Sequence, residues 1–145
     1  MSMATDIVID EVSPAEAYDV LNTTQDTALI DVRTQAEWDR IGVPDISQTG
    51  RPMWFIEWVS GPAQPPNPRF GQELLERAGD VLPSRMFFIC RSGARSAAAA
   101  NAVAVMADRL GQKVQCTNVA EGFEGSPAHG VNSGWRARGL PWRGM

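Results

Sequence analysis

The sequence has few of the residues that build disulfide frameworks, zinc sites or nucleic-acid-binding surfaces. Two cysteines and one histidine, His129, occur among 145 residues, which argues against a disulfide scaffold and against a tetrahedral zinc site. Thirteen basic and 17 acidic residues give a formal net charge of -4, so general attraction to nucleic acid or to an anionic membrane is not expected. An anionic substrate must therefore be captured locally.

Long apolar runs are also missing from the sequence. No stretch approaches the ~18 apolar residues of a membrane span, and the N-terminal ten residues lack the basic leader and apolar core of a signal peptide. We therefore expect a cytoplasmic protein. The composition, 43% hydrophobic and 21% charged, is that of a globular chain. Its length suits one hydrophobic core, so residues 1–145 are predicted to form a single domain.

Strand-like and helix-like segments alternate along the chain. Ser13 with Glu16, and Thr34 with Glu37, have the spacing of capping boxes that start helices. Strands are predicted at 5–11, 28–32, 86–89 and 113–118, and helices at 14–22, 35–40, 70–79, 94–110 and 132–138. This alternation predicts an α/β fold, with an open, mostly parallel sheet of about five strands flanked by helices on both faces.

The segment from Gly42 to Pro68 is predicted to be a long irregular connection. Residues 53–59 are aromatic and β-prone, and four prolines among residues 62–68 exclude regular structure there. Long ordered loops in compact domains tend to serve as functional rims. We therefore consider the aromatic, proline-rich stretch as a possible docking surface for another protein.

Cys90 is the strongest candidate for a functional residue. It ends the apolar run of residues 85–90 and precedes a short loop with Gly93 and then an alanine-rich helix. A helix N-terminus and the N–H groups of such a loop favour negative charge, so a thiolate and its anionic products would be stabilised. The carboxyl ends of strands are also where open α/β sheets place their chemistry.

The loop that follows Cys90 supplies the remaining substrate-binding candidates, which are Arg91, Ser92, Gly93, Ala94, Arg95 and Ser96. Gly93 is expected to take a positive φ, so that several backbone N–H groups can point inward. The planar fork of Arg95 suits an oxyanion, whereas Arg91 is expected at the rim. The serine hydroxyls can donate hydrogen bonds, although Ser96 can equally be a first-turn helix residue.

Several other residues with chemical potential are assigned structural roles. Asp31 and Arg33, at a predicted strand end, are interpreted mainly as an ion pair that supports the site. Cys116 is taken as a small buried hydrophobic residue, and the five tryptophans as packing residues. Nothing in the sequence places His129 beside Cys90, although a Cys–His pair remains an alternative.

Three segments together resemble the rhodanese-like, or sulfurtransferase, family. Residues 29–38 (LIDVRTQAEW) are similar to its D-V-R…E-[FWY] segment, residues 90–96 (CRSGARS) to its C-x-x-G-x-R-S loop, and residues 118–123 (NVAEGF) to its N-[VL]-x-G-G-[FWY] turn. Two positions depart from the family pattern. Gly42 stands where family members often have histidine, and Glu121 replaces the first glycine of the late turn.

The resemblance implies sulfur transfer through a persulfide on Cys90, with Arg95 supporting the loop and the substrate anion. The donor would be a small sulfur-containing anion such as thiosulfate, and the acceptor cyanide, a thiol or a protein. No metal or organic cofactor is expected. One alternative is a persulfide carrier or interaction module with little turnover of free thiosulfate. Another is a phosphatase or arsenate reductase, although Arg95 gives C-x4-R here, one residue shorter than the phosphatase C-x5-R.

Overall fold

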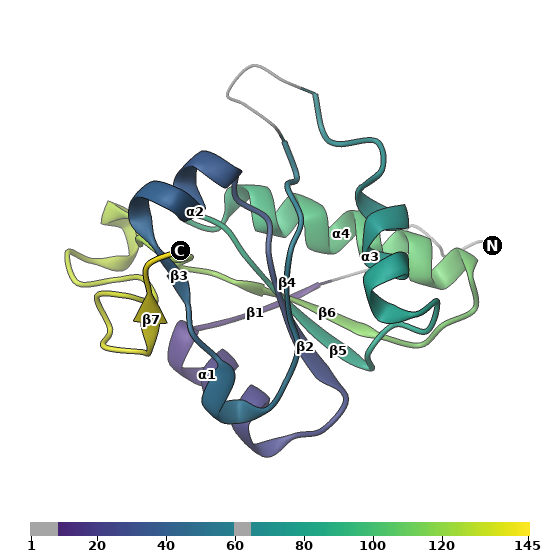
Figure 1. Ribbon diagram of the computed structural model, residues 1–145, viewed down its shortest axis with the longest axis horizontal. Coiled ribbons are helices and arrows are strands. Elements are labelled where there is room, and N and C mark those ends of the chain that lie inside the picture. Colours follow the sequence, from purple (N-terminus) through teal and green to yellow (C-terminus); the bar gives the residue numbers. More distant parts are fainter. Residues whose placement is uncertain (1–8, 60–64) are drawn as a thin grey trace.

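A five-stranded parallel sheet forms the centre of the computed structural model, which describes residues 9–59 and 65–145 (Figure 1). All neighbouring strands run parallel, as expected for strands joined by helical crossovers. The α/β fold class predicted from the sequence is confirmed. The strand order is β1 (Asp10–Val12), β6 (Gln115–Val119), β5 (Arg85–Ile89), β2 (Thr27–Asp31) and β4 (Met53–Phe55).

In the residues described, four α-helices connect and cover these strands. The two predicted capping boxes are present: Ser13 and Thr34 each accept a hydrogen bond from the backbone three residues on, and Glu16 and Glu37 reciprocate. These local bonds start the first two helices where the sequence predicted. The helices are α1 (Pro14–Thr23), α2 (Gln35–Ile41), α3 (Phe70–Ala78) and α4 (Ala94–Arg109).

The sheet separates two hydrophobic cores because side chains alternate along each strand. In β5, Met86 and Phe88 face one core, whereas Phe87 and Ile89 face the other. Helices α3 and α4 cover the first core and α1 contributes to the second, so helices lie on opposite sides of the sheet (Figure 1). Cys90 continues the alternation and lies in the first core, beneath α4.

The chain leaves β2 and β5 in opposite directions. After β2 it passes through α2 to the sheet edge at β4, and after β5 it passes through α4 to β6 on the other side. The two strands are neighbours, and the Val32 N–H donates a 2.9 Å hydrogen bond to the Ile89 carbonyl at their ends. This is a topological switch point, where the diverging connections of an open α/β sheet leave room for a ligand.

The C-terminal region differs from the prediction. Residues 132–138 form turns and not the predicted helix, because Gly134 has φ +101° and approaches residues 123–125 so closely that a Cβ would lie 2.5 Å from the Gly125 nitrogen. The chain then forms β7 (Trp142–Arg143), which pairs antiparallel with β3 (Val43–Pro44). Residues 5–8 of the strand predicted at 5–11 lie outside the described part, and β1 begins at Asp10.

The aromatic segment before α3 packs inward. Trp54 and Trp58 are partly buried against the core on the α4 side, and the Trp58 ring meets Phe70 edge to face at 5.2 Å. These contacts give the two tryptophans a packing role, as the sequence predicted for tryptophan generally. Residues 60–64 of the proline-rich stretch lie outside the described residues. In the part described, no helix combines the length and apolar character needed to cross a bilayer.

Candidate active site

Cys90 lies at the carboxyl end of β5, directly below the start of α4. The residue is 1% exposed, and its Sγ accepts a 3.1 Å hydrogen bond from the Gly93 N–H. The Ser96 Oγ lies 3.2 Å from the same sulfur. The sulfur therefore faces a backbone donor and a hydroxyl at a helix N-terminus, an arrangement that stabilises negative charge on a ligand or on the sulfur itself.

Asn118 of β6 orients Ser96. Its Nδ2 donates to the Gly93 carbonyl at 3.1 Å and to Glu11 Oε2 at 2.9 Å, which leaves its Oδ1 to accept from Ser96 Oγ at 2.6 Å. The Ser96 hydroxyl has only one proton. Asn118 and the sulfur therefore compete for that proton, and the position of Asn118 affects how strongly Ser96 can bond to Cys90.

Two glycines allow the backbone around the sulfur to pack closely. Gly93 has the predicted positive φ, +112°, and a Cβ there would lie 2.3 Å from the Ala120 carbonyl oxygen. Gly122 has φ +68°, and its Cβ would lie 2.5 Å from the Arg91 carbonyl oxygen. L-residues with side chains disfavour this region of φ and cannot occupy such contacts.

The turn after β6 is hydrogen-bonded to the backbone of the Cys90 loop. The Phe123 N–H donates to the Cys90 carbonyl at 2.8 Å, and the Glu124 N–H donates to the Arg91 carbonyl at 2.9 Å. These two bonds give both carbonyl groups of the loop a hydrogen-bond partner. The loop is thereby fixed to a turn that is itself packed in the second core through Phe123.

Arg95 projects from the first turn of α4 toward α2. Its two terminal nitrogens donate to the two carboxylate oxygens of Glu37 at 2.7 and 2.8 Å. Burial raises the pKa of Glu37, but hydrogen bonds from Arg95 and Thr34 outweigh it and lower that pKa from 4.5 to about 2. Hydrogen bonding to Glu37 in turn raises the pKa of Arg95. Arg95 therefore ties the Cys90 helix to α2.

Asp31 and Arg33 form a fully buried ion pair at the end of β2. Their side chains are 0% exposed, and Arg33 Nη2 lies 2.8 Å from Asp31 Oδ2 and 2.8 Å from the Gly42 carbonyl oxygen. The guanidinium also lies 4.4 Å from the centre of the Phe123 ring, a stabilising cation–π contact. The pair connects β2, the loop after α2 and the turn that supports Cys90.

The remaining loop residues lie nearer the surface. The Arg91 side chain is 65% exposed, with Nε 3.6 Å from Glu124 Oε2, so it stands at the rim where the sequence placed it. Ser92 is half-buried and Ala94 is exposed at the first position of α4. The whole contiguous loop was thus proposed from the sequence, but among the described residues only Gly93 and Ser96 form hydrogen bonds with the sulfur.

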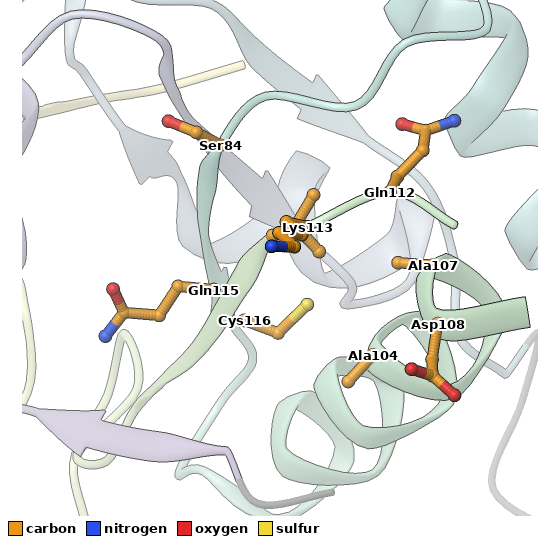
Figure 2. Close-up of a pocket in the computed structure, with 9 residues that line it drawn as sticks. Ser84, Ala104, Ala107, Asp108, Gln112, Lys113, Gln115 and Cys116 are labelled. Carbon is orange, nitrogen blue, oxygen red and sulfur yellow. The ribbon is translucent and has the colours of Figure 1, made fainter. Parts of the chain in front are cut away.

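Cys116 lies at the opposite end of the sheet. It pairs with Met86 near the start of β5, and in Figure 2 its sulfur points toward Ala104 and Ala107 of α4. It lines a cavity of about 530 Å³ that is separate from the Cys90 loop, and burial raises its pKa to about 12. His129 lies in an exposed turn and its Nδ1 shares a hydrogen bond with Ser126 Oγ. Neither Cys116 nor His129 therefore lies beside Cys90.

The two departures from the family pattern have structural reasons. At Gly42, with φ +102°, a Cβ would lie 2.9 Å from both the Arg143 carbonyl oxygen and the Trp142 ring, so β7 occupies the space of a side chain. Glu121 accepts hydrogen bonds from the Gly134 N–H at 2.7 Å and from Arg138 at 2.8 Å. Both positions hold the C-terminal region against the site.

The residues of the site were largely predictable from the sequence, but the contacts between them were not. Glu37 was recognised as a capping residue but not as the partner of Arg95, and Asn118 was recognised only as part of a motif. The strand that holds Asn118 also contains Gln115 and Thr117, so its polarity alone did not single it out. Glu11 carried no signal, since its contact depends on the pairing of β1 with β6.

Comparisons with known proteins agree with this arrangement. No family model matches the sequence. A polysulfide-sulfur transferase homodimer from Wolinella succinogenes is 24% identical, with a TM-score of 0.56 over 94% of this chain and 80% of that chain. RPA3614 from Rhodopseudomonas palustris, a protein of unknown function described as a possible tyrosine phosphatase, is 23% identical, with a TM-score of 0.53 over 97% of this chain and 88% of that chain.

These likenesses define the class of fold, which is rhodanese-like. Two proteins are more similar in sequence. Rv0390 from M. tuberculosis is 36% identical, with a TM-score of 0.73 over 96% of this chain and all of that chain. The uncharacterized RP600 homolog of Rickettsia rickettsii is 33% identical over 93% of this chain and 98% of its own length. The chain belongs to the family of these two proteins.

Proposed function

We propose that the protein is a sulfurtransferase that carries sulfane sulfur as a persulfide on Cys90. The observation that carries the proposal is the environment of Sγ, which faces the Gly93 N–H and the Ser96 hydroxyl at the N-terminus of α4. A persulfide is anionic, and this environment suits an anion. The structurally similar Wolinella protein is a polysulfide-sulfur transferase, which supports the same chemistry.

The reaction consists of two displacements. The Cys90 thiolate attacks the outer sulfur of a donor such as thiosulfate, a new S–S bond forms, and the donor's S–S bond breaks as sulfite leaves with the electron pair. A thiolate or cyanide then attacks the terminal sulfur of the persulfide, and the electron pair returns to Cys90. No net oxidation is required, so the chemistry needs neither a metal nor an organic cofactor, and ping-pong kinetics follow. Both cysteines are unpaired, which suits the cytoplasmic location that we propose.

The contacts of Arg95 favour sulfur over phosphoryl transfer. A cysteine-dependent phosphatase uses its loop arginine to bind the phosphoryl oxygens, but here both terminal nitrogens of Arg95 are engaged by Glu37. The loop between Cys90 and Arg95 is also one residue shorter than a phosphatase loop. A carrier role uses the same persulfide and differs only in its partners.

Intact-mass measurement after incubation with thiosulfate tests the proposal. We expect wild-type protein and the matched control Cys116→Ser to gain one sulfur, because Cys116 lies at the opposite end of the sheet from the Cys90 loop and its raised pKa disfavours the thiolate. Cys90→Ser should gain none. Loading of the Cys90→Ser variant, or no loading of the wild type by thiosulfate or polysulfide, would contradict the proposed function. Loading without turnover to cyanide would instead support the carrier role.

A further inference from the structure

A cavity of about 340 Å³ lies where the start of α2, the end of β4 and the first turns of α3 meet. Its volume is at the lower end of the range for small-molecule sites, roughly 300–1,000 Å³. The lining residues come from outside the Cys90 loop, so a ligand here would occupy a site of its own. They include Trp38, Phe55, Ile56, Glu57, Asn67 and Glu73.

Two glutamates in this cavity are half-buried without a cationic partner. Glu57 and Glu73 form no ion pair within the described part of the chain, and the remaining residues include no lysine, arginine or histidine. Asn67 lies between the two glutamates, because its Nδ2 donates to the Glu57 carbonyl at 3.0 Å and to Glu73 Oε2 at 3.5 Å. Charged side chains that lose hydration are usually paired, so this arrangement favours a cationic ligand.

The other contacts of the two glutamates leave this charge in place. Glu57 Oε2 accepts a 2.8 Å hydrogen bond from the Gln35 N–H at the start of α2, which leaves its second oxygen for a ligand. Arg77 follows Glu73 by one turn of α3, but its Nη2 donates to the Phe55 carbonyl at 3.4 Å. The cavity lining therefore carries two negative charges and no positive one.

The aromatic residues of the cavity indicate what else the ligand carries. Trp38 and Phe55 meet edge to face, with their ring centres 5.2 Å apart, and aromatic rings attract cations. Trp38 is 4% exposed, and its Nε1–H has no hydrogen-bond partner in the residues that the structure describes. Buried N–H groups almost always have an acceptor. A ligand with a carbonyl oxygen as well as a cationic group would supply one.

We infer that this cavity binds a guanidinium compound that also carries a carbonyl group, as an arginine amide does. The guanidinium group is planar and has five N–H donors, so it can donate to Glu57 and Glu73 together, and it is weakly hydrated enough to lie against aromatic rings. The carbonyl oxygen accepts from Trp38 Nε1–H. This site needs no reaction at Cys90, so the inference and the proposed function stand or fall separately.

Titration of isotope-labelled protein with L-argininamide, followed by two-dimensional NMR, tests the inference. The signal to follow is the Trp38 indole N–H, which Trp38→Phe identifies. L-Citrullinamide is the matched control ligand, because a neutral urea replaces its guanidinium group while the rest of the molecule is unchanged. The variants are Glu73→Gln and the control Glu76→Gln, which removes an exposed carboxylate from the same helix.

We expect argininamide to shift the Trp38 indole signal to a plateau, and citrullinamide to bind at least about tenfold more weakly, because it lacks hydrogen bonds between charged groups. Glu73→Gln should weaken argininamide binding about fivefold, whereas Glu76→Gln should change it less than about twofold. Equal binding of the two amides to the wild type, or no saturable shift of the Trp38 signal, would overturn the inference without any variant. Equal losses in Glu73→Gln and Glu76→Gln would also overturn it.

Discussion

Arg95 of α4 and Glu37 of α2 are joined by two parallel hydrogen bonds of 2.7 and 2.8 Å. Glu37 also caps its own helix through Thr34. One carboxylate thus fixes both the start of α2 and the first turn of the helix above Cys90. Substitutions at the two positions can separate support of the loop from direct contact with a substrate anion.

Arg95→Ala should slow sulfur loading by about ten- to a hundredfold, the range for one charge-assisted hydrogen bond. Arg95→Lys should restore only part of the rate, because lysine lacks the planar fork. Single-turnover loading by thiosulfate measures both. Glu37→Gln is the comparison: if Arg95 acts only through Glu37, the two variants lose the same rate, and a larger loss in Arg95→Ala indicates contact with the donor. Near-normal loading by Arg95→Ala would show that its side chain is dispensable.

The same pair should make stability depend on pH in acid. The pKa of Glu37 is depressed in the folded protein, from 4.5 to about 2, so its stabilising contribution is present above pH 4.5 and is lost as pH falls toward 2. Glu37→Gln retains a capping-box side chain and should lower the free energy of unfolding by about 1–2 kcal/mol near pH 6. Urea titrations should show this difference vanish between pH 4.5 and 2. A difference independent of pH would contradict the assignment.

Gly93→Ala should destabilise the protein and disable the site. The substitution combines an unfavourable φ of +112° with a Cβ 2.3 Å from the Ala120 carbonyl oxygen, and backbone strain of this kind costs about 1–3 kcal/mol before the clash is added. Gly79→Ala is the control, since it has φ +73° but no atom within 4 Å of its Cβ. Denaturant unfolding should show the larger loss for Gly93→Ala, and only that variant should lose persulfide loading. Equal losses of stability would mean that the contact with Ala120 relaxes freely.

Ser96→Ala should slow loading while the fold is retained. The variant removes a hydroxyl 3.2 Å from Cys90 Sγ and leaves Asn118 Oδ1 without its 2.6 Å partner. One such hydrogen bond is worth about 1 kcal/mol, so a rate loss of roughly five- to tenfold is expected. Ser92→Ala is a matched control in the same loop and should load normally. Equal rates for the two variants would exclude a role for the Ser96 hydroxyl.

The unmodified protein should hydrolyse aryl phosphates negligibly while it transfers sulfur from thiosulfate to cyanide. The physical reason is the short loop, whose ring of N–H groups suits a terminal sulfur better than a tetrahedral phosphoryl group, together with the engagement of Arg95 by Glu37. Parallel assays with both substrates on wild type and Cys90→Ser measure this. Efficient Cys90-dependent phosphatase turnover without detectable persulfide would reverse the assignment.

Local features were predictable from the sequence, and contacts between distant segments were not. The capping boxes of α1 and α2 each involve residues three apart, so their side-chain types sufficed. The Cys90 loop was likewise readable, because a strand, a glycine and an alanine-rich helix follow one another directly. The pairing of Arg95 with Glu37, 58 residues away, depends on how α2 and α4 are placed on the sheet. The turns at 132–138 depend on the approach of Gly134 to residues 123–125, which local helix propensity does not register.

The hydrogen bonds from Phe123 and Glu124 to the Cys90 and Arg91 carbonyls also decide where the loop's donors point. In a trans peptide the C=O and the following N–H lie in one plane and face opposite directions. Holding the carbonyls of residues 90 and 91 against the turn therefore directs the N–H groups of residues 91 and 92 away from it. The orientation of the loop's donors therefore depends on a turn that follows the next strand of the chain, and a substitution that displaces this turn would disturb the site without touching Cys90.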